Sequence, residues 1–136
     1  MVEILLIILA VVLVGVGALR LKVRSVRAGH RRRIAALDPE HTAPGNLVGV
    51  ASEGTPQIRG LGTLVLGATQ LVFIQLVPAR EVVVPREAIT STRSARHFLG
   101  KTTGSDLLVV TWEVQGTGDA MALAVPDLDA WRERLA

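Results

Sequence analysis

The stretch ILLIILAVVLVGVGAL, residues 4–19, decides how this chain is organised, because it is apolar throughout and a dense basic cluster follows it at once. As an α-helix with a rise of about 1.5 Å per residue, it would cover roughly 24 Å of a hydrocarbon core about 30 Å thick. Apolar residues on either side extend the run. We therefore expect residues 1–19 to form a transmembrane helix that crosses a membrane once.

A cleaved signal peptide is the alternative interpretation of this run. Such a peptide begins with positive charge, whereas the only charged residue before the run is Glu3. Small residues at Gly15, Gly17 and Ala18 supply only a weak cleavage site. Because the cations lie on the wrong side of the run for export, an uncleaved span is the better interpretation.

The basic cluster fixes the expected orientation. No acid interrupts it and no Lys or Arg precedes the span; its members are Arg20, Lys22, Arg24, Arg27, Arg31, Arg32 and Arg33. The positive-inside rule then predicts an N-terminus outside the cell (plasma) membrane and a cytoplasmic C-terminal domain. We expect these side chains to contact anionic headgroups, at about 1 kcal/mol per cation near the surface. A role only in stopping transfer and setting orientation stays open.

The basic character of the chain belongs to this one segment. The chain has 15 Lys and Arg residues and 12 Asp and Glu residues, and without the seven clustered cations eight basic residues face twelve acidic ones. A nucleic-acid partner would favour a basic domain with interleaved aromatic residues. We therefore expect no nucleic-acid partner.

Residues 20–46 are predicted to form a basic juxtamembrane segment and a linker. A helix could continue to Leu37, but Asp38-Pro39 should end it, and residues 38–46 contain two prolines and a glycine. The remaining residues, 47–136, are enough for one compact domain.

That domain has the pattern of a mainly β fold closed by a helix. Short apolar or alternating segments separated by turn residues predict strands over residues 46–51, 58–66, 70–77, 81–84, 107–114 and 120–125. Gly60 and Gly62 suit a bulge or a close backbone approach. Leu128, Trp131 and Leu135 follow at i, i+3 and i+7, which predicts an amphipathic helix, and Asp127 could cap it. A small barrel or sandwich covered by this helix is the expected architecture.

Three stretches carry a resemblance to a known family. GLGTLVL (60–66), LVF (71–73) and VVVPREAI (82–89) follow one another as in bacterial pleckstrin-homology-like (PH-like) and GRAM-like domains. LLVVTW (107–112), AVPD (124–127) and Trp131 are similar to the final hairpin and helix of those domains. The resemblance covers about residues 47–136. It implies a PH-like bent barrel of about seven strands, capped by a C-terminal α-helix, that binds rather than catalyses.

Eukaryotic relatives often hold phosphoinositides through a basic loop between their first two strands, but the corresponding ASEGTPQ (51–57) has an acid and no cation. The resemblance therefore gives little support for a phosphoinositide site. The basic residues of the domain gather instead at Arg93, Arg96, His97 and Lys101, a candidate partner-binding loop or irregular strand. A solvated loop is the alternative.

Side chains that could form a catalytic or metal-binding site are few in this sequence. With three histidines and no cysteine, Ser91, Thr92 and Ser94 have no evident base. His30 and His41 stand eleven residues apart without a third ligand. Gly100-Lys101-Thr102 lacks the earlier glycine of a phosphate-binding loop and precedes a strand rather than a helix. We expect no enzyme activity, no cofactor and no metal.

Together these features predict a single-pass, membrane-anchored, non-enzymatic binding or scaffolding module that works with an unidentified protein partner. A small accessory subunit of a larger membrane protein complex is the alternative.

Overall fold

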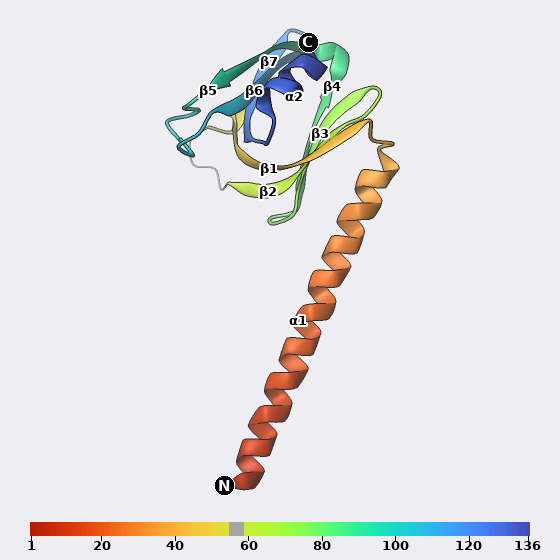
Figure 1. Ribbon diagram of the computed structural model, residues 1–136, viewed down its shortest axis with the longest axis vertical. Helices are drawn as coiled ribbons and strands as arrows, with labels where there is room; N and C mark the ends of the chain where they lie inside the picture. Colours follow the sequence, from red (N-terminus) through yellow and green to blue (C-terminus); the bar gives the residue numbers. More distant parts are fainter. Residues whose placement is uncertain (55–58) are drawn as a thin grey trace. The chain divides into compact units, whose positions relative to one another are not determined.

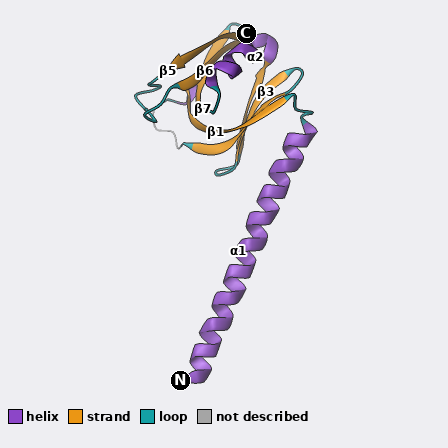
Figure 2. Cartoon of the chain, in the orientation of Figure 1, coloured by secondary structure: helices purple, strands orange, loops and turns teal. Residues whose placement is uncertain are grey.

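The computed structural model describes residues 1–54 and 59–136, which form two compact units, residues 1–36 and residues 37–136. The first unit is a single helix, α1 (Val2–Ala36), that continues without a break through the basic cluster (Figures 1 and 2). Among the described residues it is the one helix long and apolar enough to cross a membrane. The expected N-terminal apolar helix is thus confirmed, and it extends 17 residues beyond residue 19.

The second unit is a mainly β domain that ends in a helix. Its elements are β1 (His41–Val50), the 3₁₀ turn η1 (Ala51–Glu53), β2 (Gly60–Leu66), β3 (Gln70–Gln75), β4 (Arg80–Pro85), the 3₁₀ turn η2 (Arg86–Ala88), β5 (Ile89–Ala95), β6 (Leu107–Val114), β7 (Thr117–Ala124) and α2 (Leu128–Leu135) (Figure 1). All strand pairs are antiparallel, and the order across the sheet is β4-β3-β2-β1-β7-β6-β5.

The seven strands form an open sheet rather than a closed barrel. β4 and β5 are its two edges, and no ladder joins them within residues 1–54 and 59–136. α2 packs against β5 and β6, so the end of the chain returns to one half of the sheet. The expected mainly β domain with seven strands and a C-terminal helix is confirmed. The expected closure of the strands into a barrel by hydrogen bonds is not seen among the described residues.

The first strand begins earlier than the sequence indicates. Residues 41–46, which the sequence places in a linker, already pair with β2 as part of β1. Pro44 and Gly45 prevented its prediction, because both residue types are rare inside sheets. β7 pairs with β1 only from Asn46 onward, so Pro44 lies where β1 has a single neighbour and a missing N–H is tolerated. The connection between α1 and β1 is therefore only residues 37–40.

The core lies between the sheet and α2. Its largest fully buried side chains include Trp131, Phe73, Leu64 and Met121, and Leu128 and Leu135 pack against the same cluster. The stripe at 128, 131 and 135 is thereby confirmed as the docking face of the helix.

The expected cap at Asp127 is wrong. This residue has a left-handed backbone, with φ 54° and ψ 49°, and its side chain caps no helix N–H. Its backbone oxygen accepts a hydrogen bond from the Trp131 N–H, at 3.1 Å. A capping side chain usually belongs to a residue with an extended backbone, and Asp127 does not have one. The chain therefore enters α2 through a left-handed turn, and the Asp127 carboxylate forms no capping hydrogen bond.

Close backbone approach explains the glycines of β2. A Cβ at Gly62 would overlap the backbone of Ile74, and one at Gly60 would overlap the side chain of Gln75. The expected close backbone approach is thus confirmed at Gly62, whereas at Gly60 the close neighbour is the Gln75 side chain. Residues 55–58 lie outside the described residues, so the acidic loop of residues 51–57 is seen only to Gly54 and the expected strand of residues 58–66 only from Arg59.

Candidate functional site

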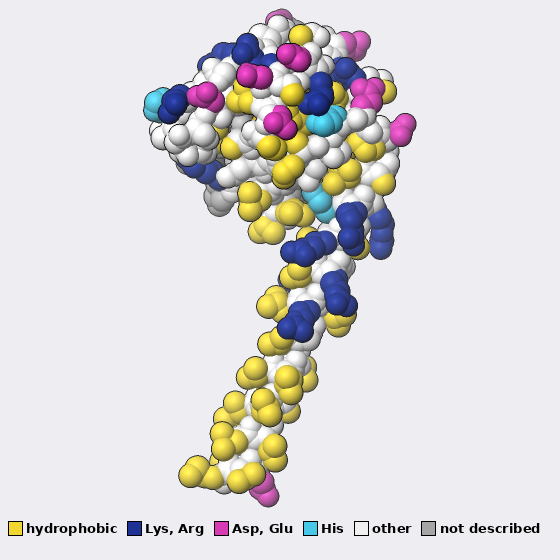
Figure 3. All heavy atoms as spheres, in the orientation of Figure 1, with side chains coloured by type: hydrophobic (Ala, Val, Ile, Leu, Met, Phe, Trp, Pro, Cys, Tyr) yellow, Lys and Arg dark blue, Asp and Glu magenta, His cyan; other side chains and the backbone are white. Residues whose placement is uncertain are grey.

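The basic cluster lies on the C-terminal part of α1, where the helix sorts its cations by face. Arg20, Arg24, Arg27 and Arg31 follow the spacing 4, 3 and 4, which places them on one side of an α-helix. All four side chains are exposed, and three of them line a shallow groove along the helix. In Figure 3 the apolar side chains cover the N-terminal stretch of α1 and the cations gather beyond it. We call these four residues the arginine stripe.

The arginine stripe suits a flat anionic surface. Successive members are displaced along the helix by about 4.5–6 Å, from the rise of about 1.5 Å per residue. Each guanidinium can form two parallel hydrogen bonds with a phosphate, which a lysine ammonium cannot. Because the side chains are exposed, salt should weaken such contacts. The sequence analysis treated the seven cations as one cluster and did not assign them to faces of a helix. Helical periodicity alone could have shown that four of them share one face.

The second candidate, at residues 93–101, is divided between a strand and a hairpin. Arg93 belongs to the edge strand β5, opposite Val109 of β6, while Arg96 and His97 follow the strand. Phe98 and Lys101 exchange two backbone hydrogen bonds of 2.9 Å, closing a tight turn in which Leu99 and Gly100 have positive φ. The loop-or-irregular-strand expectation thus becomes a regular strand as far as Ala95 and a hairpin beyond it.

A buried aromatic residue holds this hairpin on the sheet. Phe98 is only 7 % exposed and packs in a second apolar cluster with Val48, Leu107, Val109 and Ala122. The Arg59 guanidinium also donates to the Thr102 carbonyl, at 2.9 Å. The hairpin is therefore a packed element of the domain.

The charges of the hairpin are partly compensated. Arg96 forms an ion pair with Asp106 at 3.3 Å, with both side chains more than half exposed. An exposed ion pair of this kind adds little stability, but it lowers the net charge that the segment presents. His97 is exposed, as expected for a surface histidine. The structure therefore shows Arg93, Arg96, His97 and Lys101 as neighbours along a strand and hairpin.

A third feature was not predicted from the sequence. A hollow of about 270 Å³ is lined by Glu40, His41, Leu66, Arg86 and Arg134. Glu40 directly precedes β1, and the other lining residues come from the start of β1, the end of β2, η2 and α2, so the set spans almost a hundred positions of the chain. Long-range pairing of strands brings them together, and no local pattern announces it.

No family model matches the chain, and no curated protein matches it. The fold and the surface chemistry therefore carry the functional argument. Across the described residues they define a class of molecule: one helix long and apolar enough to span a membrane, with an arginine stripe, joined to a seven-stranded antiparallel β domain with a C-terminal helix.

Proposed function

We propose that this protein is a single-pass, membrane-anchored, non-enzymatic binding or scaffolding module whose PH-like domain works at the cytoplasmic face of the cell membrane. The observation that carries the proposal is the continuity of α1: one helix leads from an apolar stretch into the arginine stripe, and only four residues separate its end from β1. Such a chain keeps its folded domain permanently close to a lipid surface.

The charge distribution supports the proposed topology. The seven cations flank only the C-terminal side of the apolar stretch, which the positive-inside rule associates with the cytoplasm. Exposed arginines beside the span can hold headgroup phosphates, and this would fix the depth of the helix.

The architecture supports the PH-like assignment. Seven antiparallel strands followed by one C-terminal helix agree with what the sequence resemblance implies for residues 47–136. The helix residue Trp131 is buried against the sheet, as a capping helix requires.

Binding rather than catalysis agrees with the interior of the domain. The space between sheet and helix is filled by large apolar side chains such as Phe73, Leu64 and Trp131. Ligands would then bind at surfaces. Residues 47–136 contain eight basic and nine acidic residues, and this near-neutral charge favours a protein partner over bulk anionic lipid.

Two measurements on native membranes test the proposal. A reporter fused after Ala136 should be active in the cytoplasm, and alkaline-phosphatase-type activity there would contradict the topology. Crosslinking of the full chain in its membrane should capture a protein in an amount that depends on the β domain. A helix-only truncation, residues 1–40, is the control, and equal capture by both chains would contradict the proposed role of the domain.

A further inference from the structure

The hollow lined by Arg86 and Arg134 is the strongest unassigned feature of the β domain. Arg86 begins η2, and its Nη1 donates to Glu40 Oε2 at 3.0 Å and to the Gly67 carbonyl at 3.1 Å. Its side chain is 33 % exposed, so one part of the guanidinium is held by the protein while the rest reaches solvent. Arg86 is thus a positioned cation.

Arg134 is held in a different way. Its guanidinium carbon lies 5.7 Å from the centroid of the Trp131 ring, within range of a cation–π interaction. Trp131 is fully buried, so it offers a fixed platform. A guanidinium that rests on an aromatic face keeps its in-plane N–H groups available to an acceptor. Within residues 1–54 and 59–136, Arg134 has no ion-pair partner.

His41 completes the set of nitrogen-bearing side chains. Its ring centroid lies 5.0 Å from that of Trp131, with the two planes inclined by 57°. Both His41 and Arg134 are therefore positioned by the same buried indole, and both line the hollow. Leu66 adds an apolar contribution to the lining.

The charges around the hollow do not balance. Two guanidinium groups and one imidazole face a single carboxylate, that of Glu40, which is already engaged by Arg86. One more negative charge would balance the second guanidinium. The volume of about 270 Å³ is enough for a carboxylate group with a few waters, each of which occupies about 30 Å³ in the liquid.

We propose that this hollow binds an acidic side chain of a protein partner, with the carboxylate accepting hydrogen bonds from Arg134 and Arg86. The inference rests on the proposed function and names the chemistry of the partner. The Arg86–Glu40 pair shows that Arg86 presents an N–H to a carboxylate in this very geometry. Glu40 then competes with the partner's carboxylate, because both accept hydrogen bonds from the Arg86 guanidinium.

The test uses the full chain in micelles of a zwitterionic detergent, with a residue-specific readout. Two capped hexapeptides serve as probes, one of alternating Glu and Gly and a matched one with Gln in place of Glu. Nitrogen–proton correlation spectra follow the Nε–Hε signals of Arg86 and Arg134 and the ring of His41. Acidic peptide that binds to the cations of α1 does not disturb this readout, because each signal reports its own residue.

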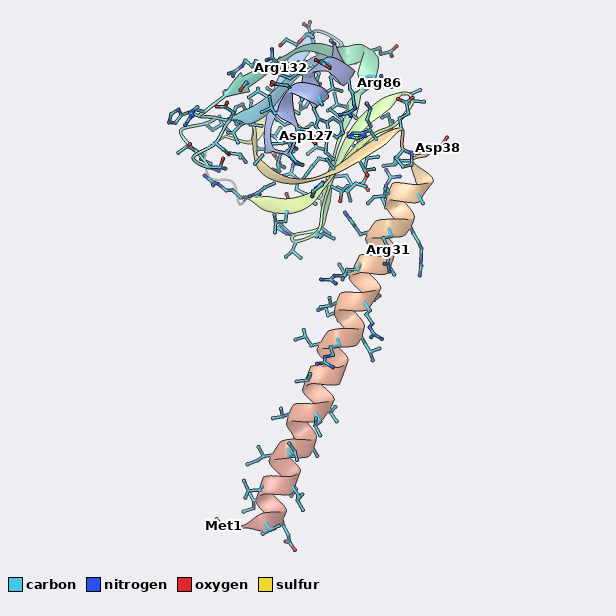
Figure 4. All side chains as sticks on the ribbon, in the orientation of Figure 1. Met1, Arg31, Asp38, Arg86, Asp127 and Arg132 are labelled. Atoms are coloured by element: carbon cyan, nitrogen blue, oxygen red, sulfur yellow. The ribbon has the colours of Figure 1, made fainter. Side chains whose placement is uncertain are left out.

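The Glu peptide should shift the signals of Arg86, Arg134 and His41, whereas the Gln peptide should not. Arg134→Gln should weaken the binding reported by Arg86 and His41 about tenfold, as loss of a charge-assisted hydrogen bond implies. Arg132→Gln is the matched control: Arg132, labelled on α2 in Figure 4, carries the same charge on the same helix. It is exposed and does not line the hollow, so its replacement should change binding by less than about twofold. Glu40→Gln should tighten binding severalfold, because it frees Arg86.

Equal weakening by Arg134→Gln and Arg132→Gln would overturn the inference, as would signals that ignore the Glu peptide. Phosphatidylglycerol added to the micelles provides a further arm. If it shifts the three signals and blocks the peptide, the hollow holds a lipid headgroup and the inference is again overturned.

Membrane crosslinking separates this inference from the proposed function. If Arg134→Gln captures the same partner as the parent chain, the proposed function stands and the carboxylate site is wrong. If the parent chain captures no protein, the proposed function itself fails, whatever the peptide does.

Discussion

Replacing Trp131 with alanine should remove a large part of the stability of the β domain. Trp131 is fully buried in the main core, between the sheet and α2. A tryptophan buries up to about 250 Å², which at about 25 cal/mol per Å² corresponds to an upper bound of about 6 kcal/mol. Residual compactness of the unfolded chain lowers that bound by roughly 10–40 %. The expected loss for Trp131→Ala is therefore about 3–5 kcal/mol, the usual range for truncating a buried aromatic residue.

Such a loss is large compared with the whole free energy of unfolding of a small domain, about 5–15 kcal/mol. For a domain of this size each kcal/mol lowers the unfolding temperature by about 4–8 °C, so we expect a decrease of at least about 12 °C. The neighbouring aromatic and cation–π contacts with His41 and Arg134 are lost as well.

The measurement is thermal unfolding of the full chain in micelles, followed by the fluorescence of Trp112. This is the other of the two tryptophans and is only 9 % exposed, so its emission reports unfolding in parent and variant alike. Trp131→Phe should lie between parent and Trp131→Ala, and Arg132→Ala should leave the unfolding temperature unchanged. A Trp131→Ala chain as stable as the parent would refute the docking of α2 on the core.

Three further predictions address the sheet, the anchor and the hairpin. Gly62→Ala should destabilise the domain by about 1–3 kcal/mol, as expected for overpacking. Gly118→Ala should cost less, because its added Cβ would meet only the Trp112 oxygen, at 3.7 Å. Equal unfolding temperatures for the two variants would contradict the close approach at β2. Replacing all seven juxtamembrane cations with Gln should produce chains in both orientations, seen as a mixture of cytoplasmic and external reporter activity; a single retained orientation would show that other features set the topology. Replacing Arg93 and Arg96, which are both exposed, with Gln should leave the unfolding temperature nearly unchanged, because exposed charges contribute little, and should reduce crosslinked capture if this segment is the partner surface.

The sequence was informative where one physical effect dominates. A run of apolar side chains can form a membrane helix with little help from the rest of the chain, so residues 1–19 were predictable. The spacing of Leu128, Trp131 and Leu135 depends only on helical geometry, and this stripe was also predictable. The close approach at Gly60 and Gly62 followed from the absence of a side chain at both positions.

Other features depend on long-range strand pairing and could not be predicted from the sequence. β5 is a polar edge strand in which no residue is fully buried, so it lacks the apolar alternation that predicts a strand. The start of β1 contains Pro44, whose fit depends on where β7 stops pairing. The hollow depends on the same sheet order, since His41 and Arg134 come together only after the chain has folded. No spacing rule could have joined them.

The connection of α1 to β1 has a mechanical consequence. β1 is the strand in the sheet that pairs with both β2 and β7, and only residues 37–40 separate it from the anchor. A pull on the domain by a bound partner would load β1 from its N-terminal end, where residues 41–45 pair with β2 alone, and would meet hydrogen bonds on both flanks from Asn46 onward. A tether joined to β4 or β5 would load a strand held on one flank, which could peel away bond by bond. The anchored strand can therefore leave the sheet only by breaking its pairing with β7 as well as with β2, so a second line of hydrogen bonds comes under load once the first residues have separated.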